Sequence, residues 1–512
     1  MIALIAIVVT VILLYLYGTR GFKYWEKRGI KHDKPIPFFG NNKEGYLQRK
    51  SVTETAVDLY WRYPNEKVIG FYRANGPELV IRDPEIAKRI LVTDFEHFYP
   101  RGINHKEVVE PLMRNLFFAD GDLWRLLRQR MTPAFTSGKL KAMFPLIIDC
   151  TDRLQKRALS ISTAGKPLDA RDLMARYTTD FIGACGFGVN ADSLGDEDSA
   201  FRELGKKIFQ PGPIDILQGI LKEMFPDACK HLKYLGRIEE DFKKFVSNVL
   251  RLRNYKPSGR NDFIDLMLEC QQKGTIVGDS IERRGKDGKP ELTSLELDEI
   301  LIAAQVFVFF AAGFETSSSA TSYTLHELAH HPEIQKKVQE EIDTVLAKYD
   351  NKLCYDAVKE MTYLEWCFRE AMRMFPSLGF LIRKSVRPYV IPELGVDIGP
   401  DVVVIIPLQA MHNDPKYFED PKEFRPERFD PEHLTREQKS IYLPFGIGPR
   451  ACIGERLGLM QSLAGLAAVL SKFSVSPANT TLRWPKVDPS SDIVQTVKGG
   501  LPLMFHERNT TS

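Results

Sequence analysis

One cysteine in a glycine-rich loop is the residue best placed to do chemistry in this chain. The loop runs from Phe445 to Gly454, and an apolar helical pattern follows it. Cys452 has no second cysteine nearby, which disfavours a zinc site or a disulfide framework. A lone thiolate suits the axial position of a haem iron, and the positive end of the next helix should favour the thiolate. Gly448 and Gly454 would let the backbone approach a flat ligand. The alternative is an inert, buried cysteine at a helix start.

A second pattern lies inside a long apolar helical stretch from Leu301 to Thr324. Its middle reads Ala312-Gly-Phe-Glu-Thr316, so a glycine, an acid and a hydroxyl interrupt a helix that should run through a core. Local rule-breaking of this kind is expected at functional sites. Gly313 would make room for a ligand, and Thr316 would hydrogen-bond and hand on a proton. The alternative is a Thr316 hydroxyl bonded back to the carbonyl of Ala312.

Two further pairs have helical spacing. Trp124 and Arg128 share one helix face, and their N–H groups suit the propionates of a haem. Glu370 and Arg373 face each other amid apolar residues, which predicts a mostly buried ion pair that needs further partners. Arg428, in the stretch Pro-Glu-Arg-Phe, is one candidate partner. Each pair alone is also compatible with an ordinary amphipathic helix.

Composition indicates the class of protein to which these residues belong. The chain has 512 residues, of which 44% are hydrophobic and 27% charged, so it is globular. The net charge is only +3, which gives no indication of nucleic-acid binding. Seven scattered cysteines, an odd number, favour a reducing compartment.

The remaining pattern is mainly helical, with a small β part. A hairpin is predicted over 68–83 and a strand-rich patch over 383–406, because β-branched runs alternate there with turn residues. The polar, glycine-bearing stretch 276–290 is predicted to be an exposed loop. No clear linker follows residue 50, so one large body is expected.

The N-terminus is predicted to anchor the chain in a membrane. Residues 1–17 are apolar apart from Thr10, and basic residues follow them. The positive-inside rule then leaves the body on the cytoplasmic side. A cleaved signal peptide is the second interpretation. We therefore divide the chain into a transmembrane anchor over 1–20, a basic and proline-containing hinge over 21–50, and one domain over 51–512.

Taken together, these residues resemble the cytochrome P-450 family. The family's cysteine-loop pattern Phe-x-x-Gly-x-Arg-x-Cys-x-Gly is complete from Phe445 to Gly454, and the other motifs occur in family order. The usual Pro-Pro-Gly-Pro hinge is reduced to Lys-Pro-Ile-Pro over 34–37. The stretches 130–139 and 309–318 are similar to the insect family-six enzymes, which oxidise plant toxins and insecticides.

The resemblance implies a mainly α fold with a small β part, a single haem-thiolate domain behind an N-terminal transmembrane helix. Cys452 would ligate the iron of haem b, and Thr316, helped by Glu315, would deliver protons. The residues implied to contact the haem are Trp124, Arg128, Arg383, Phe445, Arg450, Ala312 and, more weakly, Arg101. Glu370, Arg373 and Arg428 would support the loop.

For the substrate, the resemblance points to segments 105–118, 209–225, 378–380 and 498–501. Helical spacing places Gln305, Val308, Phe309 and Ala312 on the face of Thr316. The predicted substrate contacts are Val308, Phe309, Phe380 and Phe118. The apolar residues within 209–225 should touch the membrane, so that lipophilic substrates enter from the bilayer.

The implied reaction is monooxygenation with O2, and electrons come from NADPH through an FAD- and FMN-containing reductase, with cytochrome b5 a possible second partner. The protein would sit in the endoplasmic reticulum membrane as a single-pass protein. The basic residues expected to meet the reductase are Arg125, Lys139, Lys141, Lys439 and Arg456. Two alternatives stay open: a hydroxylase of an endogenous hormone or fatty acid, and a haem-thiolate sensor or carrier of ligands.

Overall fold

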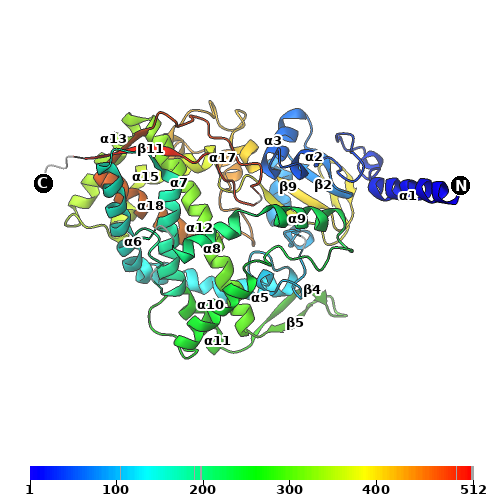
Figure 1. Ribbon diagram of the computed structural model, residues 1–512, viewed down its shortest axis with the longest axis horizontal. Helices are drawn as coiled ribbons and strands as arrows, with labels where there is room; N and C mark the ends of the chain where they lie inside the picture. The colour runs from blue at the N-terminus through cyan, green and yellow to red at the C-terminus, as the bar shows by residue number, and fades with distance from the viewer. Residues whose placement is uncertain (104, 190, 197–198, 492, 509–512) are drawn as a thin grey trace.

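A computed structural model describes residues 1–508 apart from 104, 190, 197–198 and 492. It shows a large helical body with a small β region on the side from which the N-terminal helix leaves (Figure 1). The helices are α1 (Ile2–Thr19), α2 (Lys43–Tyr46), α3 (Val52–Arg62), α4 (Pro84–Lys88), α5 (Gly121–Met131), α6 (Ser137–Thr163), α7 (Ala170–Ile182), α8 (Ala200–Phe209), α9 (Pro213–Met224), α10 (Glu239–Leu252), α11 (Phe263–Gln272), α12 (Glu299–His330), α13 (Pro332–Ala347), α14 (Tyr355–Glu360), α15 (Thr362–Met374), α16 (Leu408–His412), α17 (Arg436–Ile441) and α18 (Glu455–Lys472). The strands are β1 (Val68–Arg73), β2 (Gly76–Ile81), β3 (Leu168–Asp169), β4 (Ile276–Arg284), β5 (Pro290–Leu295), β6 (Leu381–Lys384), β7 (Tyr389–Ile391), β8 (Val396–Ile398), β9 (Val403–Ile406), β10 (Phe473–Pro477) and β11 (Pro502–Glu507).

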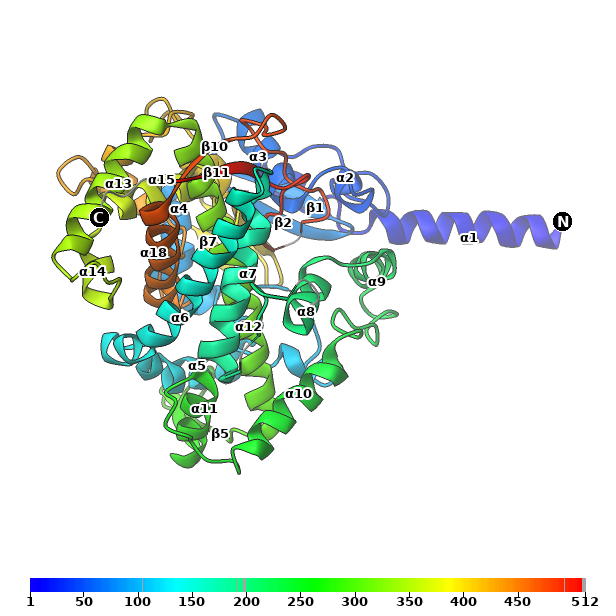
Figure 2. The same ribbon diagram turned by 60° about the vertical axis from the view of Figure 1, so that its left-hand side comes forward.

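Helix α12 is the axis of the helical body. It begins where the carboxylate of Asp298 accepts a hydrogen bond from the amide of Leu301, at 2.6 Å. Most of its side chains are buried, because α7, α10, α15 and α18 pack around it (Figure 2). The predicted long core helix is therefore confirmed, with its C-terminal end extended to His330.

The main sheet has the order β1-β2-β9-β6. Strands β1 and β2 form the predicted hairpin, β9 adds parallel to β2, and β6 pairs antiparallel with β9. The predicted strand-rich patch is thus confirmed and supplies β6 to β9. Strand β6 of this sheet carries Arg383, a predicted site residue that is distant in sequence from the cysteine loop.

The predicted exposed loop over 276–290 is wrong. The stretch contains β4 and the start of β5, which form an antiparallel hairpin that packs on α5. Ile276 and Ile281 are buried, while the other positions are mostly polar and exposed. The turn residues lie at Gly285 to Gly288, so the glycines mark the turn of a hairpin rather than a loop.

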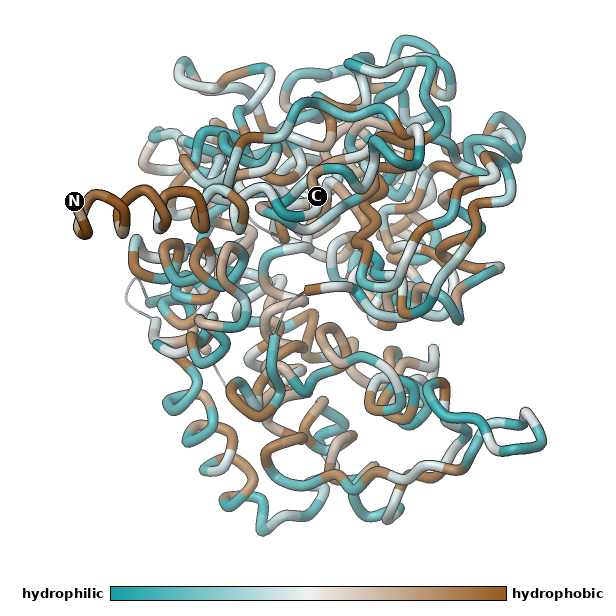
Figure 3. Tube along the Cα trace, turned by 90° about the vertical axis from the view of Figure 1, so that its right-hand side faces the viewer, coloured by the Kyte–Doolittle hydropathy of each residue, from teal (hydrophilic) through white to brown (hydrophobic). Residues whose placement is uncertain are grey.

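Helix α1 projects from the body and is apolar along nearly its whole length (Figure 3). Its 18 residues have a mean hydropathy of 2.5 and almost no buried surface, as expected of a membrane span. Helix α12 also passes this test of length and hydropathy, but 61% of its apolar window is buried in the body. At the base of α1, the Tyr17 hydroxyl donates to the carbonyl of Met224, and the Tyr17 ring stacks on Phe225.

Candidate functional site

The cysteine loop is shaped by its own backbone. The amide of Cys452 donates to the carbonyl of Phe445 at 2.8 Å, which closes the loop. Helix α18 follows at once, with Gly454 as its N-cap. The space that a side chain on Gly458 would occupy lies 3.9 Å from the Ser317 hydroxyl of α12. The first turn of α18, which follows the loop directly, therefore lies close to Ser317, the residue after the Ala-Gly-Phe-Glu-Thr pattern of α12.

Exposure identifies an open side on α12 and an accessible thiol in the loop. Ala312 is exposed in the middle of the otherwise buried α12, and Cys452 is exposed at the end of the loop. Val308 and Thr316, one turn before and after Ala312, are half-buried. A small residue of α12 and the thiol of the loop are therefore both accessible, and their contacts with a haem stay predictions.

The thiol of Cys452 is not activated by the protein alone. Although its sulfur is accessible, the thiol lies deep among protein atoms, and this desolvation raises its pKa above the ordinary value, while the amide of Gly454 and the charges of Arg128 and Arg101 act to lower it. The predicted effect of the helix end is therefore outweighed by desolvation. A metal cation at the sulfur would reverse this balance, because a coordinated thiol is deprotonated outright.

The hydroxyl of Thr316 is bonded back to its own helix, which is the alternative that the sequence left open. Its hydroxyl donates to the carbonyl of Ala312 at 2.7 Å, so the lone pairs of its oxygen stay available on the open side. The prediction that Gly313 makes room for a ligand is wrong. A side chain at Gly313 would come within 2.3 Å of Ile182 on α7, so this glycine serves the packing of α12 against α7.

Glu315 faces another neighbour. Its buried carboxylate pairs with the guanidinium of Arg171, which also donates to the carbonyl of Gln495. The ion pair ties α12 to α7 and to the C-terminal segment. The role of Glu315 in proton delivery stays a prediction, and the observed contact is with Arg171.

Four arginines that the resemblance implied as haem contacts lie close to one another, and the charges of two of them, Arg101 and Arg128, act on the thiol. Burial lowers the pKa of Arg101 to about 10 and that of Arg383 to about 9, and it also lowers the pKa values of Arg128 and Arg450. The charge of Arg101 acts on Arg383 and on Arg450, so the arginines also repel one another. Such a cluster is unfavourable unless anionic groups approach it.

Asp120 is the carboxylate that the described residues offer to this cluster. Its negative charge acts to raise the pKa values of Arg101 and Arg450. The side chain of Arg383 is only 1% exposed, and its Nε has no hydrogen-bond partner among the described residues. Arg128 donates to the carbonyl of Ala451, next to the cysteine, at 2.8 Å. A group with two carboxylates, such as a haem, fits this unbalanced cluster.

The guanidinium of Arg450 already has hydrogen-bond partners within the protein. Its Nε donates to the carbonyl of Tyr99 at 2.9 Å, and its terminal nitrogens donate to the carbonyl of Ala119 at 2.8 Å and to the carboxylate of Asp120 at 3.0 Å. Its guanidinium also lies over the ring of Trp124, 4.3 Å from the ring centre. In the observed contacts, Arg450 therefore ties the loop to the segment before α5, and its contact with a propionate stays a prediction.

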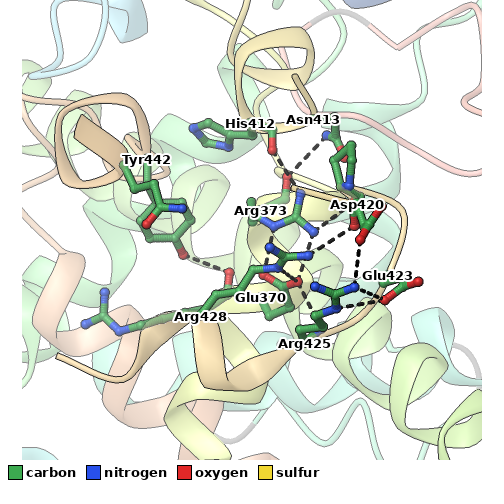
Figure 4. Close-up of polar contacts among 12 residues, drawn as sticks. Glu370, Arg373, His412, Asn413, Asp420, Glu423, Arg425, Arg428 and Tyr442 are labelled. Atoms are coloured by element: carbon green, nitrogen blue, oxygen red, sulfur yellow. Dashed lines mark hydrogen bonds and ion pairs between the residues drawn. The ribbon is translucent and has the colours of Figure 1, made fainter. Parts of the chain in front are cut away.

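The predicted buried ion pair with a third partner is confirmed (Figure 4). Arg373 binds both oxygens of Glu370, at 2.7 and 2.9 Å, and neither side chain is exposed. Arg428 joins at 3.3 Å, and the amide of Arg425 donates to the same carboxylate at 3.1 Å. Arg373 also donates to the carbonyl of His412, a residue that the sequence analysis did not single out.

The predicted substrate residues are placed differently from one another. Val308 and Phe118 are half-buried, and Val308 is on the open side of α12. Phe309 instead stacks on Phe263 of α11, with ring centres 3.5 Å apart, and this placement does not support contact with substrate. Phe380 is buried in a small cluster over the sheet.

Gln305 is also not open to a ligand. It is fully buried, accepts from the amide of Leu116 at 2.9 Å and donates to the carbonyl of Arg114 at 3.0 Å. It thereby fixes the segment that ends in Phe118 against α12.

The basic residues predicted to meet a reductase are partly neutralised. Lys139 pairs with Glu269 at 3.4 Å, and Lys141 pairs with Asp356 at 2.8 Å. Arg456 and Lys439 are exposed, while Arg125 is half-buried on α5.

Comparison with known proteins gives one consistent result. The family model described as Cytochrome P450 matches residues 31–504. "Cytochrome P450 6B6" of Helicoverpa armigera is 41% identical over 512 residues, covering 98% of each chain. "Cytochrome P450 6a2" of Drosophila melanogaster is 38% identical over 509 residues, covering 96% of this chain and 97% of the relative. "Cytochrome P450 6B1" of Papilio polyxenes is 37% identical over 492 residues, covering 96% of both.

Proposed function

Because this chain belongs to the cytochrome P450 family, we propose that it oxidises lipophilic foreign compounds, such as plant toxins or insecticides, at a membrane surface. Membership makes the chain a monooxygenase with a cysteine-ligated haem b. The choice of foreign compounds is supported by the resemblance to the insect family-six enzymes. It is also supported by the apolar, uncharged residues Val308 and Ala312 on the open side of α12.

The observation that carries the site assignment is the unbalanced arginine cluster beside an exposed thiol. Cys452 would bind the iron, and Arg101, Arg128 and Arg383 would receive the propionates. A haem with a thiolate ligand supplies oxygen activation, because the thiolate pushes electron density that favours O–O cleavage. Arg450 and Phe445 would hold the loop in the shape that this binding needs.

We propose that Thr316 of α12 takes up and passes on the protons that the reaction needs. Its hydroxyl proton is directed at the Ala312 carbonyl, so its oxygen can accept a hydrogen bond from a water in the open space. When the hydroxyl rotates away from that carbonyl, it can donate its proton to an acceptor in the open space and take a proton from the water in its place. Ala312, with its small side chain, leaves the surface beside this hydroxyl free. Electrons are proposed to come from an NADPH-dependent flavoprotein reductase that docks on the face with Arg456 and Lys439.

Access from the bilayer is supported by the position of α9. This helix lies near the base of α1 (Figure 2), and the contacts of Tyr17 with Met224 and Phe225 join the two. Ile214 is 70% exposed and Leu217 is 55% exposed on α9. We propose that these side chains enter the endoplasmic reticulum membrane, with the catalytic body on the cytoplasmic side.

We expect Ile214→Asp with Leu217→Asp, in a chain that lacks residues 1–20, to reduce partition to liposomes by about tenfold or more, because two apolar side chains leave the lipid. Flotation with phosphatidylcholine vesicles measures this. The matched control is Leu482→Asp with Val277→Asp, two apolar residues of similar exposure (56% and 54%) outside α9. If the truncated parent never partitions, membrane contact by α9 is excluded.

The other side of α9 carries an unusual contact. Within this helix the buried residue is Lys222, which pairs with the fully buried Glu110 at 2.8 Å. Glu110 also accepts from the amide of Leu235 at 3.3 Å. A charged contact thus holds α9 to the segment that leads to Phe118, and we propose that it restrains substrate entry.

Lys222→Met should speed both binding and release of substrate about tenfold, because breaking a buried ion pair costs about 3–5 kcal/mol and loosens α9. Stopped-flow recording of the Soret shift measures both rates. Lys206→Met, which removes an exposed pair with Glu203, serves as the control. Unchanged rates in the Lys222 variant would show that the pair is only structural.

The experiment that tests the substrate class is a turnover panel with a flavoprotein reductase. We expect uncharged aromatic plant toxins and insecticides to be oxidised faster than fatty acids or steroid hormones. Preference for a fatty acid or hormone would support the endogenous alternative. Ligand binding without any product would support a sensor or carrier.

A further inference from the structure

His412 lies between the Glu370 ion pair and the chain that enters the cysteine loop. Its backbone carbonyl accepts from Arg373 at 2.9 Å, and its ring Nε2 accepts from the amide of Leu443 at 3.1 Å. The residue is fully buried at the end of α16. One residue therefore contacts the ion pair through its backbone and, through its side chain, the segment that leads into the loop.

The chemistry of the ring fits this role. An imidazole nitrogen that accepts a hydrogen bond carries no proton, so the neutral ring must hold its proton on Nδ1. Burial and the positive charge of Arg373 lower the pKa of His412 to about 3, and the carbonyl of Ile441 opposes this effect. The Tyr442 ring, 5.4 Å away, is the aromatic neighbour. The acceptor is therefore present at neutral pH.

The hydrogen bonds continue from Leu443 to the cysteine. The carbonyl of Leu443 accepts from the amide of Gly446 at 3.0 Å and so begins the turn into the loop. Gly446 has a φ of +70°, which this turn requires. The carbonyl of Phe445 then accepts from the amide of Cys452 at 2.8 Å. A short chain of contacts thus connects Arg373 with the backbone of the predicted iron ligand.

We propose that His412 is a positioning residue for Cys452: its Nε2 sets the start of the loop and so keeps the thiolate on the iron. The proposal rests on Cys452 as the haem ligand. Apolar substitution of His412 would leave the buried amide of Leu443 without an acceptor, and a buried donor without a partner is unfavourable. The start of the loop would then shift, and the bond from sulfur to iron would be lost more readily.

The test uses full-length holoenzyme in detergent, reduced under carbon monoxide. The thiolate-type Soret band is followed as it converts to the thiol-type band at fixed temperature. We expect His412→Leu to convert about tenfold faster than wild type. His412→Gln, whose amide oxygen can replace Nε2 as acceptor, should stay within about twofold of wild type.

A matched control separates positioning from general destabilisation. His326→Leu removes another fully buried histidine, which lies on α12 and contacts the carbonyl of Arg483. It should lower the thermal unfolding temperature without faster conversion. The proposal is overturned if His412→Leu converts no faster than His326→Leu, or if His412→Gln behaves like His412→Leu. If wild type itself lacks the thiolate-type band, the haem assignment fails instead.

Discussion

Glu370→Ala should abolish the folded haem protein. The change leaves Arg373 and Arg428 with buried positive charge and without their shared carboxylate. Breaking a buried ion pair costs about 3–5 kcal/mol, a large part of the ~5–15 kcal/mol that stabilises a typical domain. The haem-to-protein ratio after purification and the thermal unfolding temperature by circular dichroism measure the loss.

The same helix offers a control for this variant. Glu365→Ala removes the partner of Arg369 on α15, but both side chains of that pair are about one-third exposed. Exposed pairs contribute about 0–1 kcal/mol, so normal haem content is expected. Equal effects of the two substitutions would show that the buried pair is not what holds the site together.

Thr316→Ala should separate electron use from product formation. Without its hydroxyl, position 316 can no longer take a proton from water and pass one into the open space beside Ala312. Proton transfer by a positioned side chain typically contributes 10²- to 10⁴-fold, so we expect product per NADPH to fall about tenfold or more while NADPH oxidation continues. Product and NADPH are measured in the same reconstituted assay.

Two variants control for the effect of the helix. Thr316→Ser keeps the hydroxyl and should retain most of the coupling. Thr321→Ala removes a hydroxyl with the same bond to a carbonyl one turn back, here that of Ser317 at 2.7 Å, but at a buried position of α12. Coupling that stays at the wild-type level in Thr316→Ala would remove this residue from proton delivery.

The residues that could be placed from sequence are those whose partners lie close along the chain or in a known motif. The Glu370 and Arg373 pair is three residues apart on one helix, and apolar neighbours indicate that it is buried. The cysteine loop is likewise local, because the contact from Cys452 to Phe445 closes within the motif. Arg383 and Arg128 are far apart in the sequence, so only the fold brings them into one cluster. Their shared role as haem contacts was predicted from the family resemblance.

Other features depended on partners that the sequence pattern does not contain. Gly313 faces Ile182, and Phe309 faces Phe263, because α7 and α11 pack on sides of α12 that helical spacing alone cannot distinguish. His412 belongs to none of the recognised motifs, and its ring acts as an acceptor for an amide that is 31 residues away in the sequence. Such a residue gives no periodic or motif signal before the structure brings the two segments together.

The reduced carbon monoxide difference spectrum of the full-length protein tests the central claim most directly. Our account predicts a red-shifted, thiolate-type Soret band in wild type and its loss in Cys452→Ser, while Cys367→Ser, at a buried cysteine of α15, keeps it. A wild-type protein that binds haem without this band, or a Cys452→Ser variant that retains it, would contradict the assignment of Cys452 as the iron ligand.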